Sequence, residues 1–339
     1  MNRNTAPISG IGRAHAKAIL LGEHAVVYGA PAIAFPLPDL EAVATTRLGG
    51  GSIRIDSELF SGETLDAPAR LGPIAAAIDA SLATFGLRST GAEVRIDSRI
   101  PAGRGLGSSA AVAAAVARSV AEAAGMELDA ALCFDLVQIS ERVAHVNPSG
   151  LDARAVVATR PIRFIRSSHD GNGHSGSLGD HRSTGSISIP HARVREIELG
   201  APMRFVIADS GAHGSTAEAV GIIRFRRDSD PKFANTEIDA LTDIAEGAES
   251  ELRSGEVEAI GERMFAAHRH LANLGVSSER LDALVSAAGG AGALGAKLTG
   301  GGLGGCVIAL LPADGDAERI HHALRAAGAS RTFEAQLEP

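Results

Sequence analysis

The sequence is poor in two residue types, and the few positions they occupy are therefore informative. Of its 32 lysine and arginine residues, only three are lysines: Lys17, Lys232 and Lys297. We interpret this bias as genomic composition, but it makes each lysine's position worth explaining. The two cysteines, Cys133 and Cys306, both lie among apolar residues. That setting favours buried free thiols over a disulfide.

Long apolar runs are also missing. The run at 110–117 is short, consists of alanine and valine, and is ended by Arg118. We therefore expect neither a membrane span nor a signal peptide, and a cytoplasmic location is the default. The formal net charge is −8 and the pI is near 5.8. An acidic balance of this kind disfavours nucleic acid and anionic membrane surfaces as main partners.

A length of 339 residues is enough for two domains. Strand-like and helix-like segments are mixed without a regular βαβ repeat, which favours an α+β fold. The N-terminal half is predicted to hold strand segments at 16–21, 25–28 and 32–35, a hairpin turn at 49–51 within 41–55, a helix at 71–85, a strand at 93–100, and helices at 109–124 and 129–145. The C-terminal half is predicted to hold strands at 203–209 and 306–311 and helices at 215–228, 236–253, 256–273, 278–288 and 314–327.

The segment 166–190 separates these halves and is rich in serine, glycine and histidine. Large apolar side chains are nearly absent from it, which is typical of a flexible loop or linker. Its histidines, His169, His174 and His181, are expected to be solvated rather than to bind a metal, because nothing around them fixes a ligand geometry.

Residues 101–119, PAGRGLGSSAAVAAAVARS, place three glycines directly before an alanine-rich helix. Glycine lets backbone N–H groups turn toward one point, and a helix that begins there adds free amides and the positive end of its dipole. Together they favour an anion site, most often for phosphate. Ser108 and Ser109 could cap the helix, or they could offer hydroxyl groups to a phosphate or to Mg²⁺. No Walker A pattern occurs in the chain.

A second glycine cluster, GGGLGG at 300–305, formally contains G-x-G-x-x-G. A dinucleotide fingerprint opens a helix after a strand, whereas here the predicted strand follows the glycines. We interpret the cluster as a loop of close approach between elements, facing the first glycine loop.

Several charged residues have an ordinary structural explanation and a functional one. Lys17 could be a strand lysine that faces solvent, and Glu141 a solvated residue near a helix end. Ser149 and Asp152 fit a capping box, as do Ser215 and Glu218, the latter in the segment HGSTAEAV. All of them border glycine turns or helix starts, where functional sites are commonly built.

Three stretches together resemble the signature motifs of the GHMP kinases: KAILLGEHAVVYGAPA (17–32), PAGRGLGSSAA (101–111) and AKLTGGGLGGCVIAL (296–310). Further stretches resemble the mevalonate kinase branch of that superfamily: GEHAVVYG, ERVAHVNPSGLD (141–152), DSGAHGST (209–216) and HLANLGVSSERLDAL (270–284). The match runs from about residue 12 to residue 311. Two positions depart from the family pattern. Val146 stands where glycine is common, and Leu303 interrupts the third glycine motif, where it is expected to narrow the loop over the substrate.

The resemblance implies a two-domain α+β fold. The domain at 1–195 would be similar to ribosomal protein S5 domain 2, and that at 196–339 would be ferredoxin-like, with ATP and substrate between them. The implied reaction is ATP-dependent phosphorylation of (R)-mevalonate with Mg²⁺. Asp152 would be the catalytic carboxylate with Lys17 as its basic partner, and Ser109 and Glu141 would hold the metal. The implied ATP-phosphate residues are Pro101, Gly103, Gly105, Leu106, Gly107, Ser108, Ser109 and Ala110, and the implied substrate residues are Lys17, Glu23, His24, Asp152, Thr216, Gly301 and Gly302.

Other functions stay open at this point. A phosphomevalonate kinase or another small-alcohol kinase would share the motifs. A phosphorylated substrate calls for extra basic residues, and the small number of lysines in this chain disfavours it. Diphosphomevalonate decarboxylase is disfavoured by GEHAVVYG. A silent small-molecule sensor with the same fold is disfavoured because Lys17, Ser109, Glu141 and Asp152 are all present. The sequence leaves a homodimer open, and it places the adenine loop within 50–70 only as a guess.

Overall fold

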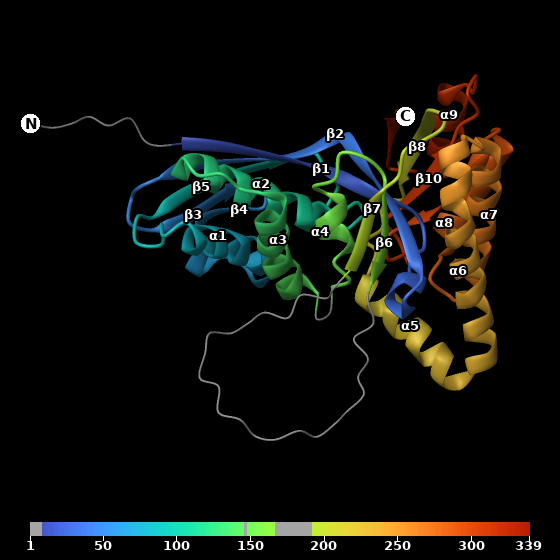
Figure 1. The fold of residues 1–339 in the computed structure, drawn as a ribbon, viewed down its shortest axis with the longest axis horizontal. Coiled ribbons are helices and arrows are strands. Elements are labelled where there is room, and N and C mark those ends of the chain that lie inside the picture. The colour runs from blue at the N-terminus through green and yellow to red at the C-terminus, as the bar shows by residue number, and fades with distance from the viewer. Residues whose placement is uncertain (1–8, 146–147, 167–191) are drawn as a thin grey trace, which may run out of the picture.

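The computed structural model describes residues 9–145, 148–166 and 192–339. The predictions for Val146 and for the histidines of the 166–190 segment lie outside the described residues. In the described parts of the chain, seven strands form one sheet in the order β4-β3-β5-β2-β6-β7, with β1 paired to β2 (Figure 1). Its strands are β1 (Ser9–Leu21), β2 (Pro31–Leu48), β3 (Ile53–Ser57), β4 (Phe60–Glu63), β5 (Ala92–Ser98), β6 (Ile162–Arg166) and β7 (Ala192–Glu196).

Helices cover one face of this sheet: α1 (Gly72–Thr84), α2 (Ser108–Ala124) and α3 (Ala130–Ala144) (Figure 1). The alanine-rich helix α2 packs closely on β1. A Cβ added at Gly12 would lie 1.9 Å from the carbonyl oxygen of Ala115 and 2.5 Å from the backbone nitrogen of Ser119. Small residues on both elements therefore allow the middle of α2 to pack directly against the backbone of β1.

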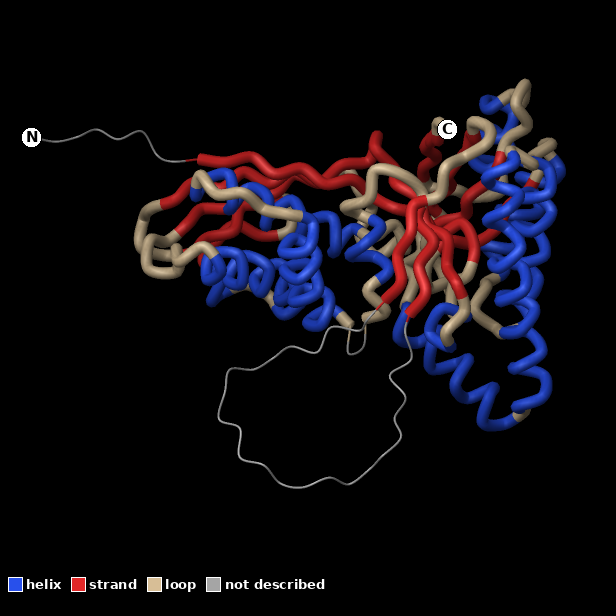
Figure 2. The backbone as a smooth tube through the Cα atoms, in the orientation of Figure 1, coloured by secondary structure: helices blue, strands red, loops and turns tan. Residues whose placement is uncertain are grey.

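The second sheet is antiparallel, in the order β11-β8-β10-β9. Its strands are β8 (Met203–Asp209), β9 (Gly295–Thr299), β10 (Cys306–Leu310) and β11 (Arg331–Leu337), and its helices are α5 (Thr216–Ser229), α6 (Pro231–Ser254), α7 (Val257–Asn273), α8 (Glu279–Gly290) and α9 (Ala317–Ala326). Figure 2 shows the strands of the two sheets meeting in the middle of the molecule, with the long helices on the outer side. Phe35 of β2 stacks on Phe205 of β8, with ring centroids 4.9 Å apart, so the two sheets share one core.

Most predicted elements are confirmed, including the helices at 71–85, 109–124 and 129–145, the strand at 203–209, and the α+β class. Ser215 caps α5 by accepting a hydrogen bond from the backbone of Glu218 at 3.2 Å, as predicted. Both cysteines are free and buried, also as predicted. None of the helices in the described parts of the chain is long and apolar enough to cross a membrane.

Two local predictions are wrong. Residues 25–28, predicted as strand, form the 3-10 helix η1 (Ala25–Tyr28), in which only Ala25 and Val26 are buried. The hairpin predicted within 41–55 does not form, because β5 lies between β2 and β3 and pairs with both. The chain passes from the first sheet to the second between β7 and β8, and the domain boundary at 195/196 stays a prediction.

Candidate active site

Lys17 lies inside β1, and its side chain is buried beneath the first glycine loop. Its backbone N–H donates to the carbonyl of Leu106 at 3.0 Å, and its Nζ donates to the carbonyl of Gly105 at 3.0 Å. The same Nζ lies 2.9 Å from Oδ1 of Asp152, and only 1% of the lysine side chain is exposed. The solvent-facing alternative for Lys17 is therefore wrong. A buried ammonium group requires such a partner.

Asp152 reaches this lysine from the short helix α4 (Leu151–Ala155), whose N-cap residue is Gly150 at φ 86°. The capping box predicted from Ser149 and Asp152 does not form, because the Ser149 hydroxyl accepts instead from the backbone of Leu151, at 3.2 Å. The Asp152 side chain turns to Lys17 and stays 35% exposed. It is therefore a charged carboxylate that a molecule from solvent can reach.

The two serines at the start of α2 do not cap it: the N-cap residue is Gly107, and no side chain caps this end. Ser109 donates its hydroxyl hydrogen to Oε1 of Glu141 at 2.6 Å. Glu141 is buried, so the prediction of a solvated glutamate is wrong. Burial raises the pKa of Glu141, and the nearby charge of Asp152 raises it further. The Glu141 carboxylate and the Ser109 hydroxyl are hard oxygen donors next to the negative charge of Asp152, and these residues fit Mg²⁺.

The glycines of the first loop adopt backbone conformations that other residues rarely reach. Gly103, Gly105 and Gly107 have φ values of 67°, 78° and 71°. A Cβ at Gly107 would lie 2.9 Å from Cγ of Lys17, and one at Gly105 would lie 2.6 Å from the carbonyl oxygen of Thr299. The loop is thus tightly packed on its protein side, and it leads into the free amides at the start of α2. Pro101, Leu106 and Ala110 are buried beside it, and Ser108 is partly exposed.

The GEH turn follows β1 and faces the second sheet. Glu23 and Lys297 form an ion pair in which both side chains are almost completely buried, and Nζ of Lys297 also donates to the carbonyl of Leu298 at 2.6 Å. His24 has a φ of 61°, an unusual value for a residue with a side chain. Burial lowers the pKa of His24 to about 4, so the ring is neutral near pH 7. Its Nε2 lies 3.0 Å from the carbonyl of Gly301; Nε2 therefore donates, and Nδ1 is left as an acceptor.

The second glycine loop closes the same region. A Cβ at Gly300 would lie 2.6 Å from Cα of Gly105, which confirms that the two glycine loops face each other. A Cβ at Gly301 would lie 2.5 Å from the hydroxyl of Thr216, the first residue of α5, and one at Gly302 would lie 2.1 Å from the carbonyl oxygen of Val276. Leu303 has a φ of 60° and packs against the core. The substrate-side residues expected from the sequence therefore meet between β1, α5 and this loop.

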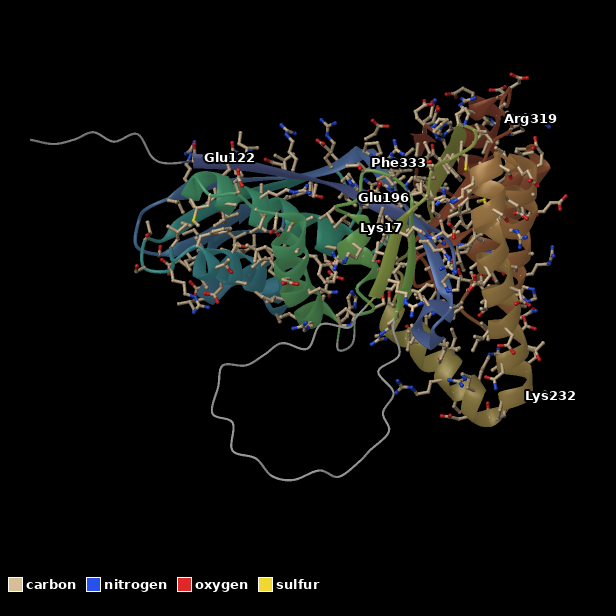
Figure 3. The ribbon with its side chains drawn as sticks, viewed as in Figure 1. Lys17, Glu122, Glu196, Lys232, Arg319 and Phe333 are labelled. Atoms are coloured by element: carbon tan, nitrogen blue, oxygen red, sulfur yellow. The ribbon has the colours of Figure 1, made fainter. Side chains whose placement is uncertain are left out.

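Lys297 stands out in the sequence as one of only three lysines, but neither its pattern nor the family resemblance gave it a role in the site. The scarcity of lysine was one available signal, and its place in AKLTGGG was another. Of the three lysines, Lys17 and Lys297 are buried at the junction of the two sheets, whereas Lys232 lies exposed at the start of α6 (Figure 3). The residues of β9 around Lys297 do not indicate that its partner is Glu23, which lies far away in the sequence.

Comparison with known proteins matches this architecture to a family of small-molecule kinases. The GHMP kinases N terminal domain matches residues 73–160, and the GHMP kinases C terminal domain matches residues 248–330. The chain belongs to the GHMP kinase family, and its two-domain α+β fold is the fold of that family.

Several proteins that this chain resembles are named mevalonate kinases. The chain is 30% identical to the mevalonate kinase of Pyrococcus furiosus, with 89% of each chain covered. It is 31% identical to that of Aeropyrum pernix, with 89% of this chain and 88% of the relative covered. Among solved structures, L. major mevalonate kinase in complex with R-mevalonate superposes with a TM-score of 0.80 at 23% identity, covering 97% of this chain and 96% of that one.

Proposed function

We propose that this protein is a mevalonate kinase, which transfers the γ-phosphoryl group of ATP to the primary hydroxyl of (R)-mevalonate and so serves isoprenoid biosynthesis. The observation that carries the proposal is the Lys17–Asp152 pair directly beneath the glycine loop, in a chain that is 30% and 31% identical to two proteins named mevalonate kinase. A cytoplasmic location and a homodimer stay predictions from the sequence.

In this proposal the carboxylate of Asp152 accepts the proton of the attacking hydroxyl. Phosphoryl transfer is mainly positioning and charge stabilisation, so the base takes its proton late and need only lie within hydrogen-bond reach. The partly exposed Asp152 can meet that hydroxyl. Lys17, whose ammonium group contacts both Asp152 and the loop carbonyl, stabilises negative charge that develops between them.

The phosphates of ATP would bind along residues 101–110, at the N–H groups of the loop and at the first turn of α2. Ser109 and Glu141 would hold Mg²⁺, which when bound neutralises charge on the phosphate oxygens. The adjacent Asp152 adds negative potential to the same corner, and this favours a cation there. The site thus has a donor set for the metal and an amide cradle for the phosphates on adjoining turns.

Mevalonate would lie on the side of Glu23, His24, Thr216, Gly301 and Gly302. The neutral His24 ring offers Nδ1 as a hydrogen-bond acceptor, which suits a substrate hydroxyl. Thr216 adds a hydroxyl at the start of α5. The buried Glu23 orients this turn through Lys297.

The test is an ATP-dependent turnover assay of the purified protein with (R)-mevalonate, 5-phosphomevalonate, homoserine and galactose. We expect kcat/KM for mevalonate to exceed the other values by more than about tenfold. Faster turnover of any of the other three would overturn the mevalonate assignment and leave a different kinase of the family. Binding of ATP without turnover of any alcohol would favour the silent sensor.

A further inference from the structure

Arg104 lies inside the first glycine loop, between Gly103 and Gly105, yet its side chain leaves the loop. Its Nε lies 2.9 Å from Oδ1 of Asp209, and its Nη2 donates to the carbonyl of Gly211 at 3.1 Å. The arginine side chain is 13% exposed and that of Asp209 is 1% exposed. The loop that we propose for the ATP phosphates is therefore tied by a largely buried ion pair to the end of β8 in the second sheet.

The carboxylate of Asp209 is held from three directions. Besides Arg104, its Oδ1 accepts from the backbone N–H of Gly211 at 2.8 Å, and its Oδ2 lies 3.2 Å from Nη2 of Arg331 on β11. Arg331 is 54% exposed, so it is the more solvated of the two arginines. Arg104 is the only one of these groups that belongs to the glycine loop, and its loss would leave Asp209 with a weaker, solvent-screened cation.

Uncharged contacts also join the first glycine loop to the segment that follows β8. The backbone N–H of Gly214 donates to the carbonyl of Gly103 at 3.1 Å. A Cβ at Gly103 would lie 2.7 Å from Nδ1 of His213, so the residue there cannot be larger without displacing that ring. The first glycine loop is thus packed against residues 209–214, and the ion pair is the charged contact within that packing.

We infer that Arg104 is a positioning residue for nucleotide binding, which acts through Asp209 to keep the loop at 103–107 in its phosphate-binding shape. The inference rests on the proposed function, in which that loop binds ATP. Three glycines make the loop conformationally free in isolation, and a loop that must be ordered on binding lowers the affinity for its ligand. An ion pair that orders the loop beforehand removes that cost. A direct contact of Arg104 with phosphate is the competing explanation. Its Nη1 and Nε are both buried without a hydrogen-bond partner in the described part of the chain, and the contact of Nε with Asp209 is an ion pair without hydrogen-bond geometry.

The experiment compares Arg104→Met, Arg104→Lys, Asp209→Asn and the double variant Arg104→Met/Asp209→Asn with the unaltered protein. Arg331→Met is the matched control, because it removes the other cation of Asp209 without touching the loop. For each protein, KM for ATP, KM for mevalonate, kcat and the shift in melting temperature with ATP are measured. If Asp209→Asn does not fold, Asp209→Glu replaces it, because that change keeps the buried negative charge but displaces the carboxylate.

We expect Arg104→Met and Asp209→Asn each to raise KM for ATP by about tenfold, with KM for mevalonate unchanged. The double variant should be no worse than either single variant, because both remove one interaction. Arg104→Lys should recover part of the loss, and Arg331→Met should leave KM for ATP unchanged. A loss of ATP affinity in Arg104→Met alone would overturn the positioning role in favour of direct phosphate contact. Unchanged KM for ATP in both single variants would also overturn it. An unaltered protein that neither turns over nor is stabilised by ATP would instead overturn the proposed function itself.

Discussion

The two buried lysines at the junction of the sheets have similar surroundings and different partners. Lys17 pairs with Asp152, whose side chain is 35% exposed, whereas Lys297 pairs with Glu23, whose side chain is 1% exposed. Both elements of the first pair belong to the N-terminal half, while the second pair joins β9 of the second sheet to the turn after β1. A carboxylate open to solvent can take part in a reaction, and one closed off on all sides can only hold structure in place. Under the proposed function, the Lys17–Asp152 pair takes part in the chemistry and the Lys297–Glu23 pair positions the elements around it.

Nearby contacts support this assignment for Lys297. On the same strand, Thr299 accepts a hydrogen bond from the backbone N–H of Ile19 at 2.8 Å and donates its hydroxyl hydrogen to the carbonyl of Ile19 at 3.1 Å. His24, next to Glu23, bonds to Gly301. Strand β9 and the loop after it are therefore attached to β1 and its turn at three points. Under the proposed function, these contacts hold together the side of the site where mevalonate would bind.

The largest effect on stability should come from removing one partner of the fully buried Lys297–Glu23 pair. Lys297→Met leaves the Glu23 carboxylate buried without a cation, which should lower the free energy of unfolding by about 3–5 kcal/mol. Urea unfolding measures the change. Lys232→Met, at an exposed lysine, should change stability by less than about 0.5 kcal/mol. The double variant Glu23→Gln/Lys297→Met should recover part of the loss, and a loss below about 1 kcal/mol in Lys297→Met would show that the pair does not hold the junction together.

Asp152→Asn tests the Lys17–Asp152 pair, whose carboxylate is partly exposed. Loss of the proton acceptor should reduce kcat by about 10²-fold or more, while KM for ATP changes little. The free energy of unfolding should also fall, because the buried Lys17 ammonium loses its anionic partner, but by less than in Lys297→Met, because the carbonyl of Gly105 still accepts from Lys17 Nζ. Steady-state kinetics at saturating ATP, together with urea unfolding, separate the two effects. Near-normal kcat in a folded variant would reduce Asp152 to a partner of Lys17. Large destabilisation with normal kcat would reverse the roles that the comparison assigns to the two pairs.

The buried His24, next to the Glu23–Lys297 pair, should make the stability of the protein depend on pH. Burial lowers its pKa from 6.5 to about 4, and the charge of Lys297 acts in the same direction. The folded state therefore resists a proton that the unfolded chain accepts below pH 6.5, so stability is fully present above pH 6.5 and falls as the pH drops toward 4. Between pH 8 and pH 5 the unaltered protein should lose about 2 kcal/mol more than His24→Gln, which cannot titrate. Urea unfolding at both pH values measures this, and equal losses in the two proteins would show that His24 is not held neutral.

The smallest expected effect concerns substrate recognition by the same histidine. His24→Ala removes the Nδ1 acceptor and should reduce kcat/KM for mevalonate by about tenfold, or roughly 1.4 kcal/mol. KM for ATP should stay nearly constant. A rise in KM for ATP of the same size would show that His24 supports the whole site through its contact with Gly301, and that it is not specific to mevalonate.

The motifs in the sequence predicted most members of the candidate site, whereas the burial of single residues could not be predicted. The glycine loop, the helix after it and the residues Lys17, Ser109, Glu141 and Asp152 were all named from motifs, and the structure brings them together. The family resemblance also implied the two pairs, Lys17 with Asp152 and Ser109 with Glu141, and both pairs are in contact. The residues taken one at a time did not indicate these contacts, because each also had an ordinary explanation as a solvent-facing lysine, a capping residue or a solvated glutamate. Burial depends on which distant elements pack on a residue, and periodicity within one segment does not carry that information.

The pair of Lys297 and Glu23 was missed for a related reason. Strand β9 is five residues long and buried throughout, so it shows no alternation that would predict a strand. For residues 25–28 the error was the reverse: a strand was predicted from a short apolar run, but the segment forms a 3-10 helix. Short apolar segments are ambiguous in sequence, and tertiary packing decides between the alternatives.

The placement of the three lysines has a practical consequence for amine chemistry. Reagents that acylate primary amines need an accessible, unprotonated nitrogen, and the ammonium groups of Lys17 and Lys297 are enclosed and ion-paired. Lys232 lies instead at the outer turn between α5 and α6, well away from Lys17 (Figure 3). Among the lysines, an activated ester should therefore modify one side chain, at a point remote from the glycine loops. A dye or a surface linker attached at that turn would leave the catalytic region free.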